Sequence, residues 1–275
     1  MDKKAILKLK QATQARIIDC KQALEESNGN FEKAIIWLRK KGQQIAIKRI
    51  GNSVDKGGIF AKVNTDNSLG IMLSLGCETD FVARNELFEK LGDTLLNFAL
   101  QNQCKNVEDL LKLKKDQATI QEYIREVSAT LGENILIKEY AILTGTLIAA
   151  YIHTGNRIGS LIALNTKPSP TTLEVARNLA MQIVVSDPIS IDENTLDPII
   201  LAREKIIIEE ELQKAGKPKA IAEKIAQGKL SKFITEATLL PQPFMKDNTQ
   251  TVGQYLKSID PKLSIIDFKR FFVNT

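Results

Sequence analysis

The chain has 275 residues, of which 43% are hydrophobic and 26% are charged. This composition is that of an ordinary globular protein long enough for about two domains, and no apolar run approaches the ~18 residues that a membrane-spanning helix needs. The 38 lysines and arginines only slightly outnumber the 33 aspartates and glutamates, which favours an acidic partner weakly and does not indicate a nucleic-acid-binding protein.

The residue types that carry most enzyme chemistry are scarce. His153 is the single histidine, and Cys20, Cys77 and Cys104 are dispersed, so a tetrahedral zinc site would need all four of them together. The sequence contains no phosphate-binding P-loop motif, no glycine-rich dinucleotide motif and no His-Glu-x-x-His motif. We therefore expect a binding protein without a cofactor, a metal ion or covalent chemistry of its own.

The N-terminus and the cysteines give an expectation about location. Lys8 and Lys10 interrupt the apolar segment that would form the core of a signal peptide. An odd number of dispersed cysteines fits a reducing compartment. We expect a cytoplasmic protein.

Residues 1–50 predict a small helical domain. Apolar residues recur at helical spacing in two stretches before an Asn-Gly turn signal, and Asn30 can cap a third helix. Gly42 is expected to end that helix as a left-handed residue, with a fourth short helix over residues 43–50. Residues 51–55 are expected to form a linker.

An adjacent pair of isoleucines stands out in this domain. Ile17 and Ile18 would lie about 100° apart on a helix, so they cannot both face the same core. Either the outward isoleucine packs on the next helix, or the pair forms a docking patch flanked by Lys10 and Lys21.

The middle of the chain contains an internal repeat. Ile59–Leu75 aligns without gaps with Ile148–Leu164, and six of the seventeen aligned positions are identical. Each copy has an apolar run, a polar turn and then a glycine followed by a second apolar run. This order predicts a β-hairpin in each copy.

An amphipathic helix is expected to follow each hairpin, capped by Asn85 in the first copy and beginning at Pro170 in the second. Each copy then ends in an alternating segment that predicts a strand, at residues 135–140 and 266–272. In the latter segment, one face would carry Ile266, Phe268 and Phe272, and the other Asp267, Lys269 and Phe271.

The repeat and its flanking elements predict the architecture. The chain is expected to belong to the α+β class, with the helical domain at residues 1–50 followed by two related core units at residues 56–143 and 144–275. Each unit would be an antiparallel sheet covered by helices.

The second unit contains an insertion, at about residues 197–228, that predicts a hairpin of two antiparallel helices. Asp197 can cap the first helix with Pro198 at its first position, and Gly216 and Pro218 would separate it from the return helix. At 1.5 Å per residue the first arm would be roughly 25 Å long. Such a hairpin either protrudes, to pack on a partner or on a second copy of the chain as a homodimer, or folds back onto the sheet.

The segment Cys77–Arg84 joins the first hairpin to its helix and carries an acid beside a phenylalanine. In one interpretation, Thr79 or Asp80 caps the helix and Phe81 packs into the core as a hydrophobic staple. In the other, Phe81 is presented at the surface as part of a contact site.

Five segments of the chain, in order, resemble the elongation factor Ts family. Thr13–Leu24 resembles its N-terminal signature and Thr79–Arg84 its second signature, while His153–Gly159 resembles a hairpin with the pattern His…Gly-x-Arg-Ile-Gly. Gly216–Lys224 and Gln242–Phe244 also look like family segments. Together the matches cover nearly the whole chain, which makes the resemblance specific.

The resemblance implies an N-terminal domain of the ubiquitin-associated type, a two-part core and an inserted coiled-coil hairpin. It implies a guanine nucleotide exchange factor that binds elongation factor Tu in its GDP-bound and nucleotide-free states. The loop of Thr79, Asp80, Phe81 and Val82 would enter the GTPase domain of that partner near its magnesium site, with Asp80 and Phe81 as the wedge. We expect no direct contact with nucleic acid or membrane.

The resemblance also implies further partner contacts. The positions concerned are Lys10, Ile17, Ile18 and Lys21 in the N-terminal domain, His153 in the second hairpin, and Phe244 and Met245 in a later loop. For His153, the alternative is a histidine that only stabilises its turn.

Two other functions remain open at this point. An adaptor without exchange activity would use the helical domain and the helical hairpin as interaction modules, and it would not need the Asp80–Phe81 loop to be exposed. An enzyme would require a pocket around His153 with carboxylates nearby.

Overall fold

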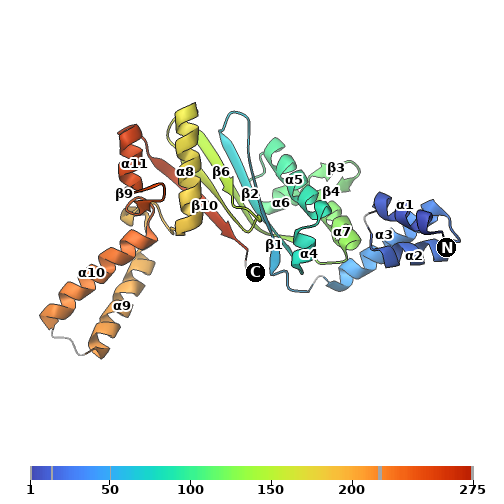
Figure 1. Ribbon diagram of the computed structural model, residues 1–275, viewed down its shortest axis with the longest axis horizontal. Coiled ribbons are helices and arrows are strands. Elements are labelled where there is room, and N and C mark those ends of the chain that lie inside the picture. Colours follow the sequence, from blue (N-terminus) through green and yellow to red (C-terminus); the bar gives the residue numbers. More distant parts are fainter. Residues whose placement is uncertain (1, 14, 50, 216–218, 274–275) are drawn as a thin grey trace.

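The computed structural model describes residues 2–13, 15–49, 51–215 and 219–273. It combines helices with antiparallel sheets, which confirms the predicted α+β class. The molecule is elongated, with the N-terminal helices at one end, two sheets in the middle and a helical hairpin projecting from the other end (Figure 1).

Three N-terminal helices pack around a small core of their own. They are α1 (Lys3–Thr13), α2 (Ile17–Glu26) and α3 (Phe31–Arg49). Leu9, Cys20 and Leu24 are buried at the centre of this core, and the side chain of Asn30 caps α3 by accepting a hydrogen bond from the amide of Lys33 at 2.9 Å. The predicted cap at Asn30 is therefore confirmed.

The expected helix end at Gly42 is wrong, because α3 continues through Gly42 to Arg49 without a break. A Cβ atom at Gly42 would lie 2.9 Å from the Cβ of Ala129, on the helix α7 (Ile120–Leu131) of the first core unit. The glycine therefore permits close contact between two helices. The residues expected to form a separate fourth helix belong to the last turns of α3, except for Ile50, which lies outside the described residues.

The first core unit is a three-stranded antiparallel sheet in the order β1-β2-β5, covered by helices. Its elements are β1 (Lys56–Val63), β2 (Leu69–Cys77), α4 (Asp80–Ala83), α5 (Glu86–Gln101), α6 (Val107–Lys112), β3 (Lys114–Lys115), β4 (Ala118–Thr119), α7 and β5 (Leu136–Thr144). Side chains of β2, α5 and α7 share one apolar core. Asn85 caps α5 as predicted, accepting from the amide of Leu87 at 2.9 Å.

The second core unit repeats this plan with the sheet order β10-β7-β6. Its elements are β6 (Leu147–Ile152), β7 (Ile158–Leu164), α8 (Pro170–Ser186), a 3-10 turn η1 (Glu193–Thr195), β8 (Pro243–Phe244), β9 (Asp247–Thr251), α11 (Val252–Ile259) and β10 (Ile265–Phe272). The predicted hairpins β1-β2 and β6-β7 are thus confirmed, and α8 begins at Pro170 as predicted.

The expected alternation along β10 holds from Asp267 to Phe272, where the pairing with β7 is regular, and is wrong only at Ile266. The pairing with β7 is irregular between Ile265 and Asp267, so that Ile265 is buried and Ile266 is exposed. Phe271 is buried and its neighbour Phe272 is half exposed. A β-bulge shifts the register of the faces by one residue, which simple alternation does not anticipate.

The two sheets pack face to face in the middle of the molecule. Side chains from β1, β2 and β5 meet those of β6, β7 and β10 in one apolar layer. Helices α5 and α7 lie on the outer side of the first sheet and α8 lies on the outer side of the second (Figure 1). The core is therefore a four-layer arrangement of helix, sheet, sheet and helix.

The insertion in the second unit forms two antiparallel helices, α9 (Pro198–Lys214) and α10 (Lys219–Ala237). Asp197 caps α9 as predicted, and the expected break at residues 216–218 lies outside the described residues. The return helix extends beyond the expected limit at residue 228. Both helices point away from the sheets (Figure 1), which excludes the interpretation in which the hairpin folds back onto the core.

Candidate partner-binding site

The loop that follows β2 presents a phenylalanine to solvent. Thr79 caps the short helix α4 by accepting a hydrogen bond from the amide of Val82 at 3.4 Å. Phe81 is 84% exposed, whereas the next residue, Val82, is buried in the core of the first unit. The predicted cap at Thr79 is confirmed, but Phe81 does not pack inward as a staple. The ring of Phe81 is therefore available to a partner, on a loop that is anchored on both sides.

Asp80 stands at the start of α4 beside this phenylalanine. One of its carboxylate oxygens lies 3.3 Å from a guanidinium nitrogen of Arg84, and both side chains are accessible to solvent. An ion pair this exposed contributes little to stability. Asp80 and Arg84 are therefore free to exchange this contact for one with a partner.

Glu133, which precedes β5, holds the loop from beneath. Its Oε2 accepts hydrogen bonds from the backbone amides of Glu78 at 3.1 Å and Thr79 at 3.0 Å, and its Oε1 accepts one from the Thr79 hydroxyl at 2.6 Å. The thiol of Cys77 donates to the carbonyl of Thr79 at 3.2 Å. Burial, together with the nearby charge of Glu133, raises the pKa of Cys77 to about 12, which keeps this donor protonated.

The side chain of Glu78 ties the same loop to two other segments. It accepts hydrogen bonds from the amide of Asn134 at 2.7 Å, from the guanidinium of Arg49 at 2.7 Å and from the amide group of Asn52 at 2.8 Å. Although burial opposes its ionisation, these donors and the Arg49 charge hold the pKa of Glu78 below its ordinary value. The last turn of α3 is thereby joined to the loop that carries Phe81.

The turn between β6 and β7 lies beside the loop. Its residues 154–157 and the loop residues Asp80 and Arg84 line the same hollow of about 470 Å³. The turn is held against the first sheet by a hydrogen bond from the amide of Ile59 in β1 to the carbonyl of Asn156 at 2.7 Å. The two signature segments, far apart in the sequence, thus form one surface.

His153 is at the edge of this surface and does not line the hollow. It is exposed, and its Nδ1 lies 3.2 Å from the hydroxyl of Tyr151. Its backbone amide donates to Ile158 and its carbonyl accepts from Asn156, which closes the turn. His153 therefore stabilises its turn through the backbone and leaves its ring accessible.

The N-terminal residues form a second, separate surface. Ile17 and Ile18 are 54% and 72% exposed at the start of α2, so the interpretation in which one of them packs on the next helix is wrong. Lys10 and Lys21 are also exposed, and Lys21 makes only a 3.9 Å ion pair with Glu25. This patch lies at the far end of the molecule from the hairpin (Figure 1).

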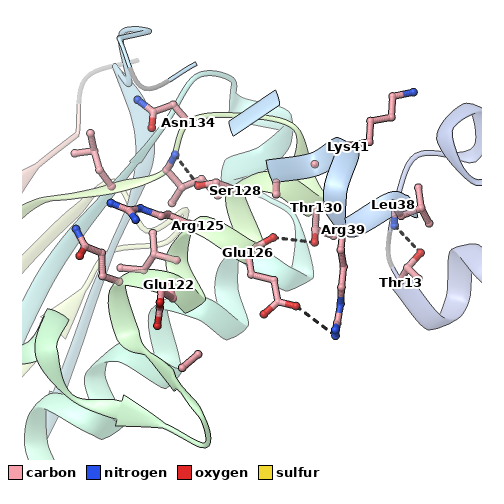
Figure 2. Close-up of a pocket in the computed structure, with 18 of the residues that line it drawn as sticks. Thr13, Leu38, Arg39, Lys41, Glu122, Arg125, Glu126, Ser128, Thr130 and Asn134 are labelled. Carbon is pink, nitrogen blue, oxygen red and sulfur yellow. Dashed lines mark hydrogen bonds and ion pairs between the residues drawn. The ribbon is translucent and has the colours of Figure 1, made fainter. Parts of the chain in front are cut away.

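A groove of about 1270 Å³ separates the N-terminal helices from the core. Figure 2 shows Arg39 reaching from α3 toward Glu126 on α7, with a guanidinium-to-carboxylate distance of 3.5 Å. The groove carries charges of both signs, with the cations Lys41 and Arg125 and the anions Asp19 and Glu122 among its lining residues. This ion pair between Arg39 and Glu126 is exposed and contributes little, so the close approach at Gly42 is the main contact between α3 and α7.

The last two predicted contact residues, Phe244 and Met245, differ in their exposure to solvent. Phe244 is buried and stacks on Tyr255, with 4.0 Å between ring centroids. Met245 is 45% exposed, and its amide donates to the side chain of Gln182 at 2.7 Å. Only Met245 is therefore available to a partner in this conformation.

Sequence reasoning did not identify Glu78 and Glu133 as part of the site. Glu78 stood within a motif without an assigned role, and Glu133 lies 54 residues from Thr79 in the sequence. Among the described residues, no cluster of histidine, cysteine or acidic side chains could hold a metal ion, and no helix has the length and apolarity needed to cross a membrane.

Comparison with known proteins agrees with the resemblance of the motifs. The family model described as Elongation factor TS matches residues 78–275. The chain is 43% identical over 268 residues to elongation factor Ts of Amoebophilus asiaticus, with 98% of this chain and 97% of that relative covered. It is 40% and 38% identical, each over 263 residues, to elongation factors Ts of Flavobacterium psychrophilum and Christiangramia forsetii, with 96% of this chain and 95% of each relative covered.

Proposed function

This chain belongs to the elongation factor Ts family, and we propose that it binds elongation factor Tu carrying GDP and speeds release of that nucleotide in the cytoplasm. The observation that carries the proposal is the exposure of Phe81 on a loop whose backbone is held by Glu133 and Cys77. Covering a large apolar side chain with a partner is favourable, by about 1.5–3 kcal/mol for full burial.

The physical basis is competition for the groups that hold GDP. A GTPase holds its nucleotide by backbone amides around the phosphates and by Mg²⁺. Asp80 and Phe81 would enter near the magnesium site and displace the residues that organise the ion. Because binding then favours the state with a loosened nucleotide site, bound GDP and the bound factor weaken each other by the same factor.

This mechanism requires no acid, base or nucleophile from the factor. Both partners leave the reaction covalently unchanged, so the protein would be an exchange factor and not an enzyme of covalent chemistry. His153, whose ring faces solvent beside Tyr151, would contribute a contact from the adjacent turn.

The other proposed contacts would set affinity. Ile17 and Ile18 present exposed apolar surface with Lys10 and Lys21 close by, which suits a partner surface that is apolar with acidic groups around it. Met245 would add a third contact from the second unit. Helix α3 is joined to the Phe81 loop by the ion pair between Arg49 and Glu78. We therefore propose that the N-terminal patch and the Phe81 loop engage one partner together.

Stopped-flow release of fluorescent GDP from elongation factor Tu, with increasing amounts of this protein, tests the proposal. The expected result is a release rate that rises and saturates. Tight binding without acceleration would instead support the adaptor, which has the same interaction modules but no wedge.

A further inference from the structure

We propose that Glu133 is the positioning residue of the Asp80–Phe81 loop, an inference that rests on the exchange function proposed above. Its carboxylate receives three hydrogen bonds from the loop, two from backbone amides and one from the Thr79 hydroxyl. Hydrogen bonds to a charged acceptor are roughly twice as strong as neutral ones. Among the described residues, Arg49 and Asn52 each make one side-chain hydrogen bond to the loop, whereas Glu133 makes three.

The loop needs an external support because its own structure is short. Helix α4 has four residues, and Phe81 is too exposed to be fixed by packing. Val82 is the buried anchor on the far side of the phenylalanine, and the near side is held by Glu133. The direction in which Phe81 projects is therefore set by these two attachments.

Glu133 is itself held rigidly. It follows Gly132, which ends α7 in the left-handed conformation with φ of 74°. The amide of Glu133 donates to the carbonyl of Ser128 at 3.2 Å, and the Ser128 hydroxyl accepts from the amide of Ile135 at 3.1 Å. The turn is thus fixed on both sides of the glutamate.

The two segments also bind each other reciprocally. Glu133 accepts from the amide of Glu78, while Glu78 accepts from the amide of Asn134, the neighbour of Glu133. Loss of Glu133 removes one half of this clamp but leaves Glu78 bound to Asn134 and Arg49. The N-terminal contacts with a partner would therefore survive, and the placement of the wedge would not.

This separation gives a test in two parts, with Glu133→Ala, Glu133→Gln and the exposed α6 residue Glu108→Ala as a matched control. In the free protein, amide hydrogen exchange at Glu78 and Thr79 measures the positioning itself. Glu133→Ala should accelerate exchange at these two amides by about tenfold or more. Glu133→Gln should largely restore protection, because both amides share one oxygen that glutamine retains.

The second part measures stimulated GDP release from elongation factor Tu. Glu133→Ala should lower the maximal rate by about tenfold or more and change the half-saturating concentration by less than about threefold, since misplacement of a working group costs rate and not binding. Glu133→Gln should lie between Glu133→Ala and the wild type, and Glu108→Ala should match the wild type.

The outcomes separate this inference from the proposed function. If the wild type fails to stimulate GDP release, the exchange proposal is wrong, and the amide exchange data still decide whether Glu133 holds the loop. If the wild type stimulates release and Glu133→Ala does so equally, or if the two amides keep their protection in that variant, the positioning role is wrong.

Discussion

The backbone amide of Ile59 donates a hydrogen bond to the carbonyl oxygen of Asn156 at 2.7 Å, and the repeat-equivalent amide of Ile148 donates to Asn67 at 2.7 Å. Each copy of the repeat thus binds the turn of the other copy in the same way. Asn156 and Asn67 both have left-handed backbone, with φ of 56° and 61° respectively, which asparagine tolerates better than most residues. The two core units are therefore related by an approximate two-fold axis through their facing sheets.

This relationship explains two glycines of the repeat and predicts the effect of changing one. A Cβ at Gly70 would lie 2.6 Å from a methyl of Ile148, and its repeat-equivalent at Gly159 would lie 2.9 Å from a methyl of Ile59. Gly70→Ala should therefore destabilise the protein by about 1–3 kcal/mol through overpacking, measured by urea unfolding.

Gly228 provides the control for that measurement. It lies within α10, and a Cβ there would meet nothing within 4 Å. Gly228→Ala should stabilise the protein by up to about 1 kcal/mol, because alanine favours the helix. A Gly70→Ala variant as stable as the wild type would contradict the tight packing between the sheets.

Truncation of two phenylalanines of the predicted site should have very different effects on stability. Phe244 is 3% exposed and stacks on Tyr255, so Phe244→Ala should cost about 3–5 kcal/mol of unfolding free energy. Phe81 is exposed, and Phe81→Ala should change stability by less than about 0.5 kcal/mol. Thermal or urea unfolding of both variants measures the contrast, and a large loss in Phe81→Ala would mean that Phe81 packs inward.

The N-terminal patch is predicted to contribute to affinity. Ile18→Ser should weaken binding to elongation factor Tu by about 1–3 kcal/mol without loss of stability, because Ile18 is exposed in the free protein. Ile259→Ser, on α11 at the other end of the molecule, is the control and should bind as the wild type does. Titration calorimetry measures both variants, and equal affinities would exclude the patch from the interface.

The clamp at Glu78 predicts a pH dependence. Hydrogen bonds from Asn134 and Asn52 and the Arg49 charge outweigh burial and hold the pKa of Glu78 below its ordinary value. The unfolded chain binds this proton near its ordinary pKa of about 4.3, so the stabilisation is complete above that pH and is lost as the pH falls through the lower folded pKa.

Unfolding experiments between about pH 6 and pH 3 test whether Glu78 loses its stabilising effect as the pH falls. The free energy of unfolding should fall less steeply toward acid in Glu78→Gln than in the wild type, because the variant lacks one group that takes up a proton on unfolding. Parallel curves for the two proteins would show that Glu78 has no depressed pKa.

Features that depend on neighbouring residues were predictable from the sequence. The caps at Asn30, Thr79 and Asn85 each use a side chain and an amide two or three residues apart, a distance that the local pattern fixes. The hairpins were predictable because the repeat supplied each pattern twice. The exposure of Phe81 was left open, since a loop phenylalanine can staple inward or face solvent with the same sequence.

Features that depend on distant residues were not predictable. Gly42 resembles a helix end until Ala129 is placed against it. The bulge after Ile265 depends on pairing with β7, and the role of Glu133 depends on a loop 54 residues away. Each of these contacts is made by tertiary packing, which overrides local preference.

The most direct test of the wedge is the rate of GDP release from elongation factor Tu at saturating concentrations of the wild type and of Phe81→Ala. The account predicts that Phe81→Ala still binds but stimulates release at least about tenfold less, because the variant loses contacts that form only with the loosened nucleotide site. Equal maximal rates for the two proteins would contradict the proposal that Phe81 drives nucleotide release.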